Sequence, residues 1–327
     1  MENPVLESAY WITERSKHVS IDKDSVKRLA AEIVSSKSQG LCNTAVWGSH
    51  ELNPSTPDET TADWVFVVDI LNFSFWYDDG TPVIVEYRGR VWSGYWSLVA
   101  AINKALDSGI PITTPSYYAT ITDETMAAVF ASPSGRLCPL LKERAAALRD
   151  AGCWLMAEYD GTFRNVVQSC ERDAVRLASL LGESLSSFSD RGVYEGRPVV
   201  FYKRAQICVA DLWASHNGED IGSFDNIGSI TVFADYRVPQ ALALKGVLRY
   251  SETLLAKLNT AGEGGLLEPG CPMEAEIRGV CIAAADMVAR TAGETAALVD
   301  FYLWDWVKTL PEEALTVPMH RTRGIYY

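Results

Sequence analysis

Apolar residues recur at helical spacing along most of the chain, which predicts a protein built mainly from α-helices. In residues 22–37, for example, apolar positions three or four residues apart fall on one face of a helix. Further helices are predicted at residues 97–108, 122–131, 139–158, 162–183, 203–213, 250–259, 273–292 and 294–308. Residues 41–57, 184–192 and 261–272 are rich in small polar residues or glycine, which predicts loops.

Two stretches depart from the helical period. Polar and apolar residues alternate in Val-Ile-Val-Glu-Tyr-Arg-Gly at residues 83–89. With turn signals at Asp79-Gly80 and Arg88-Gly89, this predicts a β-hairpin. A second short hairpin or strand is predicted at residues 193–202. The aromatic run before the first hairpin is either a buried helix or a strand, because its period does not decide. The predicted fold class is mainly α with a small β element.

Composition and charge narrow the class of protein. The 327 residues are 48% hydrophobic with no repeat or linker, so we expect a single domain over residues 1–327, either undivided or made of two lobes with the ligand site between them. The net charge of −13 argues against a polymeric nucleic-acid partner, whose binding needs a basic face. The longest apolar runs are too short to span a bilayer, and nothing indicates an obligate protein partner.

Cysteine and histidine usage indicates the compartment and excludes one kind of site. Seven cysteines are widely spaced without a CxxC pair, which favours reduced thiols in a cytoplasmic protein. The four histidines form no HExxH motif and no Cys/His cluster, so no metal site is predicted.

Asp235 is the first candidate for chemistry. A largely apolar run from Ile230 to Ala234 leads directly into it. Apolar surroundings raise the free-energy cost of a carboxylate's charge and so shift its pKa, which is typical of groups that take part in catalysis. The alternative is an ordinary helix cap, since Asp is a favoured N-cap and a helix is expected to follow. The sequence leaves both open.

Two more carboxylates stand among aromatic residues. Asp300 and Asp305 lie in Asp-Phe-Tyr-Leu-Trp-Asp, which is unusual for a solvated helix face. Four aromatic side chains are candidates for stacking a flat ring, or alternatively for core packing: Phe75, Trp76, Phe233 and Tyr236.

A basic pair completes the set of candidates. Lys203 and Arg204 are expected in the first turn of a helix, whose amino end is already positive, which favours an anion bound there. The alternative is that both side chains extend to solvent. His50 lies in a predicted loop, where a surface histidine is the simpler interpretation. Carboxylates, stacking rings and an anion clamp together suit glycosidic cleavage of a nucleotide through an oxocarbenium-like transition state.

Long, ordered motifs then connect the chain with a known family. They are HELNP at 50–54, LNFSFW at 71–76, SGYWSL at 93–98, GIPIT at 109–113, SYYAT at 116–120, FYKRAQI at 201–207, ITVFADYRVPQ at 230–240, EIRG at 276–279, DFYLWD at 300–305 and HRTRGIYY at the end. With these motifs the whole chain resembles the queuosine salvage family, the queuosine 5'-phosphate N-glycosylase/hydrolases.

The resemblance implies hydrolysis of queuosine 5'-monophosphate to queuine and ribose 5-phosphate, without a cofactor, so that queuine returns to tRNA. It implies a fold similar to that of helix-hairpin-helix DNA glycosylases. Asp300 is the favoured catalytic group and Asp235 the group that holds the base, although the reverse stays open and Asp305 is a third candidate.

The remaining predicted site residues bind the substrate. His50, Phe233 and Tyr236 would line the base site, Trp76 would stack on the base, and Lys203 with Arg204 would hold the 5'-phosphate. Two other classes of function compete with this one: a non-catalytic binding protein for queuine or its nucleotide, and a glycosylase acting on nucleic acid.

Overall fold

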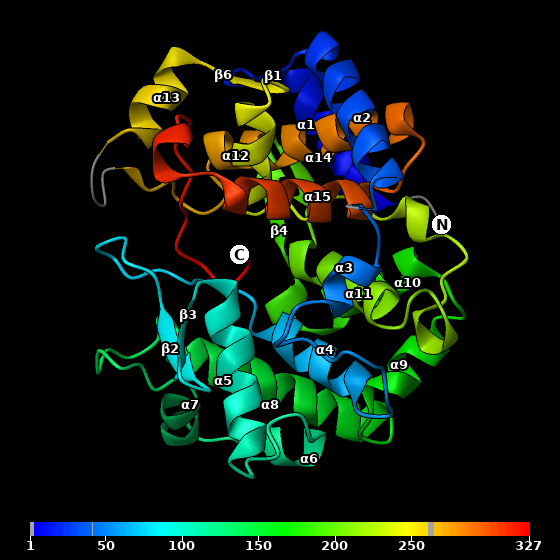
Figure 1. Ribbon diagram of the computed structural model, residues 1–327, viewed down its shortest axis with the longest axis vertical. Coiled ribbons are helices and arrows are strands. Elements are labelled where there is room, and N and C mark those ends of the chain that lie inside the picture. The colour runs from blue at the N-terminus through cyan, green and yellow to red at the C-terminus, as the bar shows by residue number, and fades with distance from the viewer. Residues whose placement is uncertain (1–2, 41, 261–264) are drawn as a thin grey trace. The chain divides into compact units, whose positions relative to one another are not determined.

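Helices dominate the computed structural model, which describes residues 3–40, 42–260 and 265–327 (Figure 1). The α-helices are Pro4–Arg15 (α1), Lys23–Ser38 (α2), Ala45–Gly48 (α3), Thr61–Ile70 (α4), Tyr95–Asp107 (α5), Pro115–Tyr118 (α6), Asp123–Val129 (α7), Leu141–Glu158 (α8), Phe163–Ser169 (α9), Ala174–Ser184 (α10), Lys203–Ser215 (α11), Arg237–Leu244 (α12), Glu252–Leu258 (α13), Pro272–Ala292 (α14) and Ala296–Thr309 (α15). Short 3-10 turns are Ser186–Phe188, Asp220–Gly222, Ile227–Ser229 and Glu312–Ala314.

The strands form antiparallel pairs. They are Val19–Ile21 (β1), Ile84–Tyr87 (β2), Arg90–Ser93 (β3), Arg191–Tyr194 (β4), Arg197–Val200 (β5) and Leu248–Tyr250 (β6). β2 pairs with β3 as the predicted hairpin. β4 pairs with β5, so the stretch left open between a hairpin and a strand is a hairpin, whereas β1 pairs with the distant β6. The predicted fold class, mainly α with a small β element, is confirmed.

The predicted helix at residues 162–183 is wrong, because the chain breaks it into α9 and α10. Glu171 and Arg172 adopt left-handed backbone conformations with φ of 53° and 64°. Asp173 then starts α10 by accepting a hydrogen bond from the Arg176 N–H at 3.0 Å. The apolar stripe therefore continues across two helices rather than along one.

Two further predicted stretches can be compared with the structure. The pattern of residues 63–80, the aromatic run before the first hairpin, does not decide between helix and strand. The first part of this run forms the buried helix α4, which ends at Ile70, and the part from Leu71 to Tyr77 is neither helix nor strand. The predicted loop at residues 41–57 contains the short helix α3, and residues 261–264 of the predicted loop at 261–272 lie outside the described residues.

Two compact units share the chain, and each collects segments that are distant in sequence. The first unit contains residues 1–46, 190–206 and 226–323, and the second contains residues 47–189, 207–225 and 324–327. The prediction of one domain over residues 1–327 stays a prediction.

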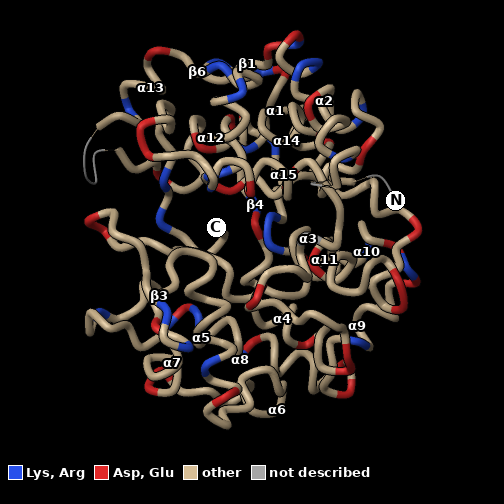
Figure 2. Tube along the Cα trace, viewed as in Figure 1, with Lys and Arg blue, Asp and Glu red and all other residues tan. Residues whose placement is uncertain are grey.

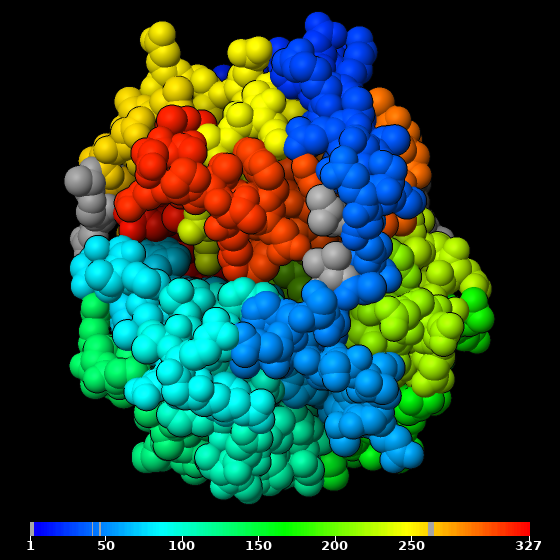
Figure 3. Space-filling model, viewed as in Figure 1, coloured from blue at the N-terminus to red at the C-terminus, as the bar shows by residue number. Residues whose placement is uncertain are grey.

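The first unit is built around α14. This helix packs against α1, α2, α12 and α15, and most of its residues are buried (Figure 1). Gly279 allows the close approach of α1, because a Cβ at that position would stand 2.7 Å from the Ile12 side chain. α15 covers part of α14 and lies at the surface of this unit in the space-filling view (Figure 3).

The second unit is built around α4, α5 and α8. α8 packs against α4, α6 and α7, while α5 packs against the β2–β3 hairpin. A fully buried arginine, Arg144 of α8, donates to the carbonyl oxygens of Leu71 at 2.6 Å and of Ser74 at 3.1 Å, and also to that of Phe73. It therefore satisfies the backbone where α4 ends and the motif LNFSFW begins.

Charged residues of both signs are interspersed along the helices of each unit (Figure 2). No helix in the described part of the chain combines the length and the hydropathy that a membrane span requires.

Candidate active site

Asp235 caps helix α12. Its Oδ1 accepts hydrogen bonds from the N–H groups of Arg237 at 2.7 Å and Val238 at 2.9 Å. These are the N2 and N3 amides if Asp235 is taken as the N-cap, which fits the helical backbone angles of Tyr236. The helix-cap alternative is confirmed. Both bonds are accepted by the same carboxylate oxygen, Oδ1, so Oδ2 takes no part in capping the helix.

Asp300 is tied to the same backbone segment from another helix. It lies on the buried face of α15, 4% exposed, and its Oδ2 accepts the N–H of Phe233 at 2.7 Å. Phe233 precedes Asp235 by two residues, so both carboxylates converge on the segment that leads into α12. The pKa of the nearby Cys281 thiol is raised well above its usual value, first by burial and then by the negative charges of these two groups.

Aromatic rings accompany the two carboxylates. Phe233 is buried, and its ring centroid lies 6.2 Å from that of Phe301. Tyr236 is half-buried. Burial and the neighbouring charge of Asp235 raise the pKa of its phenol, which therefore stays protonated and able to donate a hydrogen bond.

Asp305 differs from Asp300 in its exposure. The residue is exposed by surface area, yet desolvation by the surrounding residues raises the pKa of its carboxyl above the usual value. The expectation that it lies in apolar surroundings stays a prediction. It lies five positions after Asp300 on α15, which places it about 140° around the helix at about 100° per residue. The charge of Lys308, three residues later, opposes the increase in the pKa of Asp305, and the Lys308 Nζ lies 3.2 Å from the Trp304 ring centroid. A role for Asp305 in catalysis stays a prediction.

The basic pair begins α11, as predicted. Lys203 is 4% and Arg204 is 1% exposed, so the alternative in which both extend to solvent is wrong. The Lys203 N–H, expected to face an anion, instead donates to Asp190 Oδ2 at 3.2 Å. An anion at this position would therefore be held by the Lys203 ammonium rather than by its amide.

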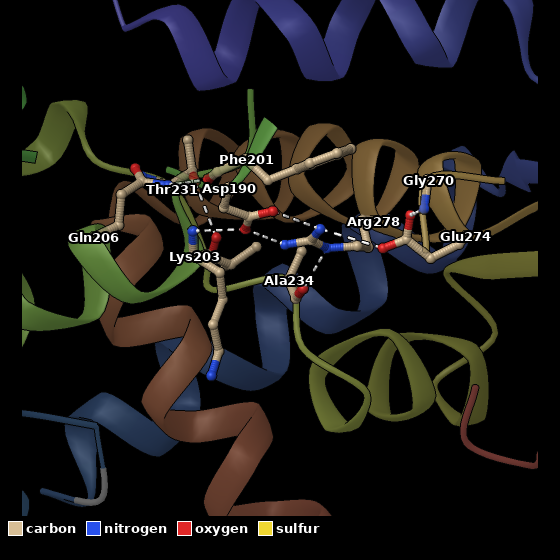
Figure 4. A network of polar contacts seen from close by, with 10 residues as sticks. Asp190, Phe201, Lys203, Gln206, Thr231, Ala234, Gly270, Glu274 and Arg278 are labelled. Carbon is tan, nitrogen blue, oxygen red and sulfur yellow. Dashed lines mark hydrogen bonds and ion pairs between the residues drawn. The ribbon is translucent and has the colours of Figure 1, made fainter. Parts of the chain in front are cut away.

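A buried ion-pair network surrounds this helix start (Figure 4). Arg278 of α14 donates to both carboxylate oxygens of Asp190 and, at 3.2 Å, to Glu274. Its Nε donates to the Ala234 carbonyl oxygen at 3.0 Å. Figure 4 shows the Lys203 side chain pointing away from these carboxylates.

His50 and Trp76 belong to the second unit. The His50 ring stacks on Trp96 with centroids 3.3 Å apart and planes within 6°, and its Nδ1 accepts the Leu52 N–H at 3.3 Å. Trp76 is 7% exposed, and its backbone forms an isolated antiparallel β-bridge with Pro82. Within its own unit His50 is therefore part of an aromatic stack rather than an isolated surface side chain. Its contact with substrate, like that of Trp76, stays a prediction.

Comparison with known proteins gives one consistent result. The family model described as "Queuosine salvage protein" matches residues 52–327. The chain belongs to this family.

Curated relatives of the family extend over the full length of the chain. A mouse protein named queuosine 5'-phosphate N-glycosylase/hydrolase is 41% identical over 335 residues, covering 98% of each chain. Proteins of the same name from Schizosaccharomyces pombe and Sphaerobacter thermophilus are 39% and 38% identical, and cover 99% of this chain and 99% and 97% of their own.

The sequence did not single out Asp190, Arg278 or Arg144 as candidates. Arg278 stands in the motif EIRG, on a helix whose other residues are largely buried. A charged residue on a face that is otherwise apolar was the available signal, because charged side chains are seldom fully buried unless they are paired.

Proposed function

We propose that this chain hydrolyses the N-glycosidic bond of queuosine 5'-monophosphate, releasing queuine and ribose 5-phosphate for reuse of queuine in tRNA. Family membership supports the substrate class. The observation that carries the proposal is the convergence of Asp235 and Asp300, both buried, on one backbone segment. Two carboxylates at one position suit a reaction whose transition state carries positive charge on the sugar.

The leaving group explains why the carboxylates would matter so much. Queuine is a 7-deazaguanine, so protonation at N7, which eases departure of ordinary purines, is closed to it. Departure must instead be assisted by hydrogen-bond donors or a proton at the other edges of the base, whereas carboxylates accept from its N–H groups and so hold it in place. The base also bears a secondary ammonium, which pairs with a carboxylate.

In the proposed step, Asp300 activates water and stabilises the sugar cation. The bond between C1' and the base nitrogen breaks, and its electron pair leaves on that nitrogen. The water oxygen bonds to C1' while Asp300 accepts one proton of that water. The departing base nitrogen takes up a proton from solvent, and Asp300 returns its proton to solvent. The Phe233 N–H holds Asp300 Oδ2 in a fixed orientation for this role.

Asp235 would hold the base through the oxygen that does not cap α12. Phe233 and Tyr236 would line the base site. His50 and Trp76 stay candidates for base contacts that the sequence alone suggests. Lys203, with the buried positive charge of Arg204 behind it in the first turn of α11, would bind the 5'-phosphate.

Two finer assignments accompany the proposal. A likeness to helix-hairpin-helix DNA glycosylases is supported by an Asp that precedes a helix in the context Ala-Asp-Tyr-Arg-Val. A cytoplasmic location is supported by seven cysteines that are all free thiols.

Incubation with queuosine 5'-monophosphate, followed by chromatography for free base and ribose 5-phosphate, tests the proposal. We expect stoichiometric release of both products. Tight binding without release would instead identify a non-catalytic binding protein. Release from intact tRNA or DNA, with affinity that falls steeply as salt rises, would identify a nucleic-acid glycosylase.

A further inference from the structure

The side chain of Arg278 contacts both parts of the candidate site within the first unit. It is 2% exposed and projects from α14 between the segment that enters α11 and the segment that enters α12 (Figure 4). The guanidinium nitrogens donate hydrogen bonds in three directions, to Asp190, to the Ala234 carbonyl oxygen and to Glu274.

One direction leads to the phosphate clamp. Asp190, 3% exposed, accepts from Arg278 through both carboxylate oxygens, with 3.0 Å between Nη1 and Oδ1. The same Asp190 Oδ2 accepts the Lys203 N–H at 3.2 Å, and its backbone oxygen accepts the Phe201 N–H at 2.9 Å. Asp190 therefore fixes the start of α11 from two sides, and Arg278 fixes Asp190.

A second direction leads to the catalytic segment. Arg278 Nε donates to the carbonyl oxygen of Ala234 at 3.0 Å. Ala234 is the residue immediately before Asp235, so this bond sets the backbone from which the Asp235 carboxylate projects. The Phe201 ring covers the guanidinium, with 4.1 Å between Cζ and the ring centroid.

The third direction anchors the guanidinium itself. Glu274 lies one turn earlier on α14 and accepts from Nη1 at 3.2 Å. Its other oxygen accepts the Gly270 N–H at 3.2 Å. The arginine is therefore held on its own helix while it reaches the other two segments.

We propose that Arg278 is a positioning residue that sets the distance between the phosphate clamp at Lys203 and the carboxylate of Asp235. This inference rests on the proposed function, since it assigns Arg278 to the same site. A planar fork with five donors serves three acceptors in fixed directions, whereas the ammonium of a lysine presents a compact charge on a flexible stem. Arg278→Lys therefore keeps the charge and removes the geometry.

A purely structural ion pair is the competing explanation, because removing one partner of any buried pair destabilises a fold. The same helix offers a matched control for it. Glu276 is 1% exposed and accepts from Ser16, Lys17, His18 and Tyr194, on the side of α14 that faces the chain after α1. Glu276→Gln disturbs a buried polar network of α14 without touching either part of the site.

The experiment measures kcat and KM for queuosine 5'-monophosphate and for the unphosphorylated nucleoside, below the melting temperature of every variant. For Arg278→Lys we expect kcat on both substrates to fall at least tenfold and the preference for the monophosphate to fall at least threefold. For Glu276→Gln we expect a lower melting temperature and less than a twofold change in either quantity.

A second background separates positioning from general damage. If Arg278 acts on phosphate recognition through Lys203, then Arg278→Lys leaves the preference unchanged when Lys203→Ala is already present. Asp190→Asn serves where Arg278→Lys does not fold. It keeps Arg278 paired with Glu274, and we expect it to lower the preference at least threefold with less than a twofold change in kcat on the nucleoside.

Different outcomes would refute the positioning role of Arg278 and the proposed function. If the wild-type protein releases base but Arg278→Lys, or in its place Asp190→Asn, behaves like Glu276→Gln, the positioning role is wrong and the proposed function stands. An equal loss of preference with and without Lys203→Ala also refutes the positioning role. If the wild-type protein releases no base, the proposed function fails, and the positioning role fails with it.

Discussion

Replacement of Asp235 by asparagine separates the charge of this side chain from its role as a helix cap. Asn and Asp cap helices about equally well, so the two hydrogen bonds to the Arg237 and Val238 amides survive the change. The lost interaction of a negative charge with the amino end of α12 is worth about 0.3–1 kcal/mol. We therefore expect Asp235→Asn to fold, with a free energy of unfolding lower by less than about 1 kcal/mol.

The expected effect on catalysis is much larger. A hydrogen bond to a charged group contributes about 1.5–3 kcal/mol. At about 1.4 kcal/mol for each factor of ten, its loss from the transition state lowers kcat/KM by about 10- to 150-fold. Asp235→Ala removes the cap as well, and costs about a further 1 kcal/mol of stability.

Base release measured by chromatography, beside thermal unfolding followed by calorimetry, supplies both quantities. The matched control is Asp173→Asn, since Asp173 caps α10 by accepting the Arg176 N–H at 3.0 Å. It should show the small change in stability without the loss of activity. Should Asp235→Asn release base at the wild-type rate, while Asp235→Ala loses activity only in proportion to its unfolded fraction, Asp235 is a helix cap and nothing more.

Three further predictions address the neighbouring groups. Lys203→Ala should lower kcat/KM for the monophosphate by about 10- to 150-fold, the worth of one charged hydrogen bond, and for the nucleoside by less than about threefold; an equal loss on both substrates would remove the phosphate clamp. Asp300→Asn should lower kcat by about 100- to 10,000-fold, as expected for a group that transfers a proton, and should lower stability by about 1 kcal/mol through its weakened bond to Phe233; near-full turnover would exclude Asp300 from the reaction. His320 is buried, and this burial, together with the positive charge of Arg278, lowers its pKa to about 3. Between about pH 6.5 and about pH 3, the unfolded chain therefore binds a proton at this histidine that the folded chain does not bind. The free energy of unfolding should therefore fall with decreasing pH by about 1.4 kcal/mol per pH unit from this group, and His320→Gln should flatten that slope; parallel slopes in the two proteins would show that His320 titrates normally.

Local patterns predicted the elements that local interactions determine. The β2–β3 hairpin follows from alternation and from the turn at Arg88-Gly89, where both residues adopt left-handed conformations. The break between α9 and α10 was missed because Glu171 and Arg172 are not residues that signal such a conformation, although Asp173 was a legible helix start. The pairing of β1 with β6 joins three-residue strands far apart in sequence, which no local pattern can indicate.

The candidate site divides in the same way. Asp235 and Lys203 stand at helix starts that the sequence indicates, so their local structure could be predicted. The tie between Asp300 and the Phe233 amide is tertiary, and the motif alone does not show which face of α15 is buried. For the same reason the motif does not show that Asp305 is more exposed than Asp300.

The interleaved composition of the first unit constrains the order in which the protein can assemble during synthesis. β1 cannot pair until β6 has been synthesised, about 230 residues later in the chain. At typical elongation rates this takes roughly 10–50 s. The buried carboxylate of Asp190 remains without this ion-pair partner for a shorter interval, since Arg278 follows it by 88 positions. The nascent chain must therefore carry residues 1–46 unpaired while most of the second unit is already complete, a period in which chaperones have access to the faces of α1 and α2 that α14 later covers.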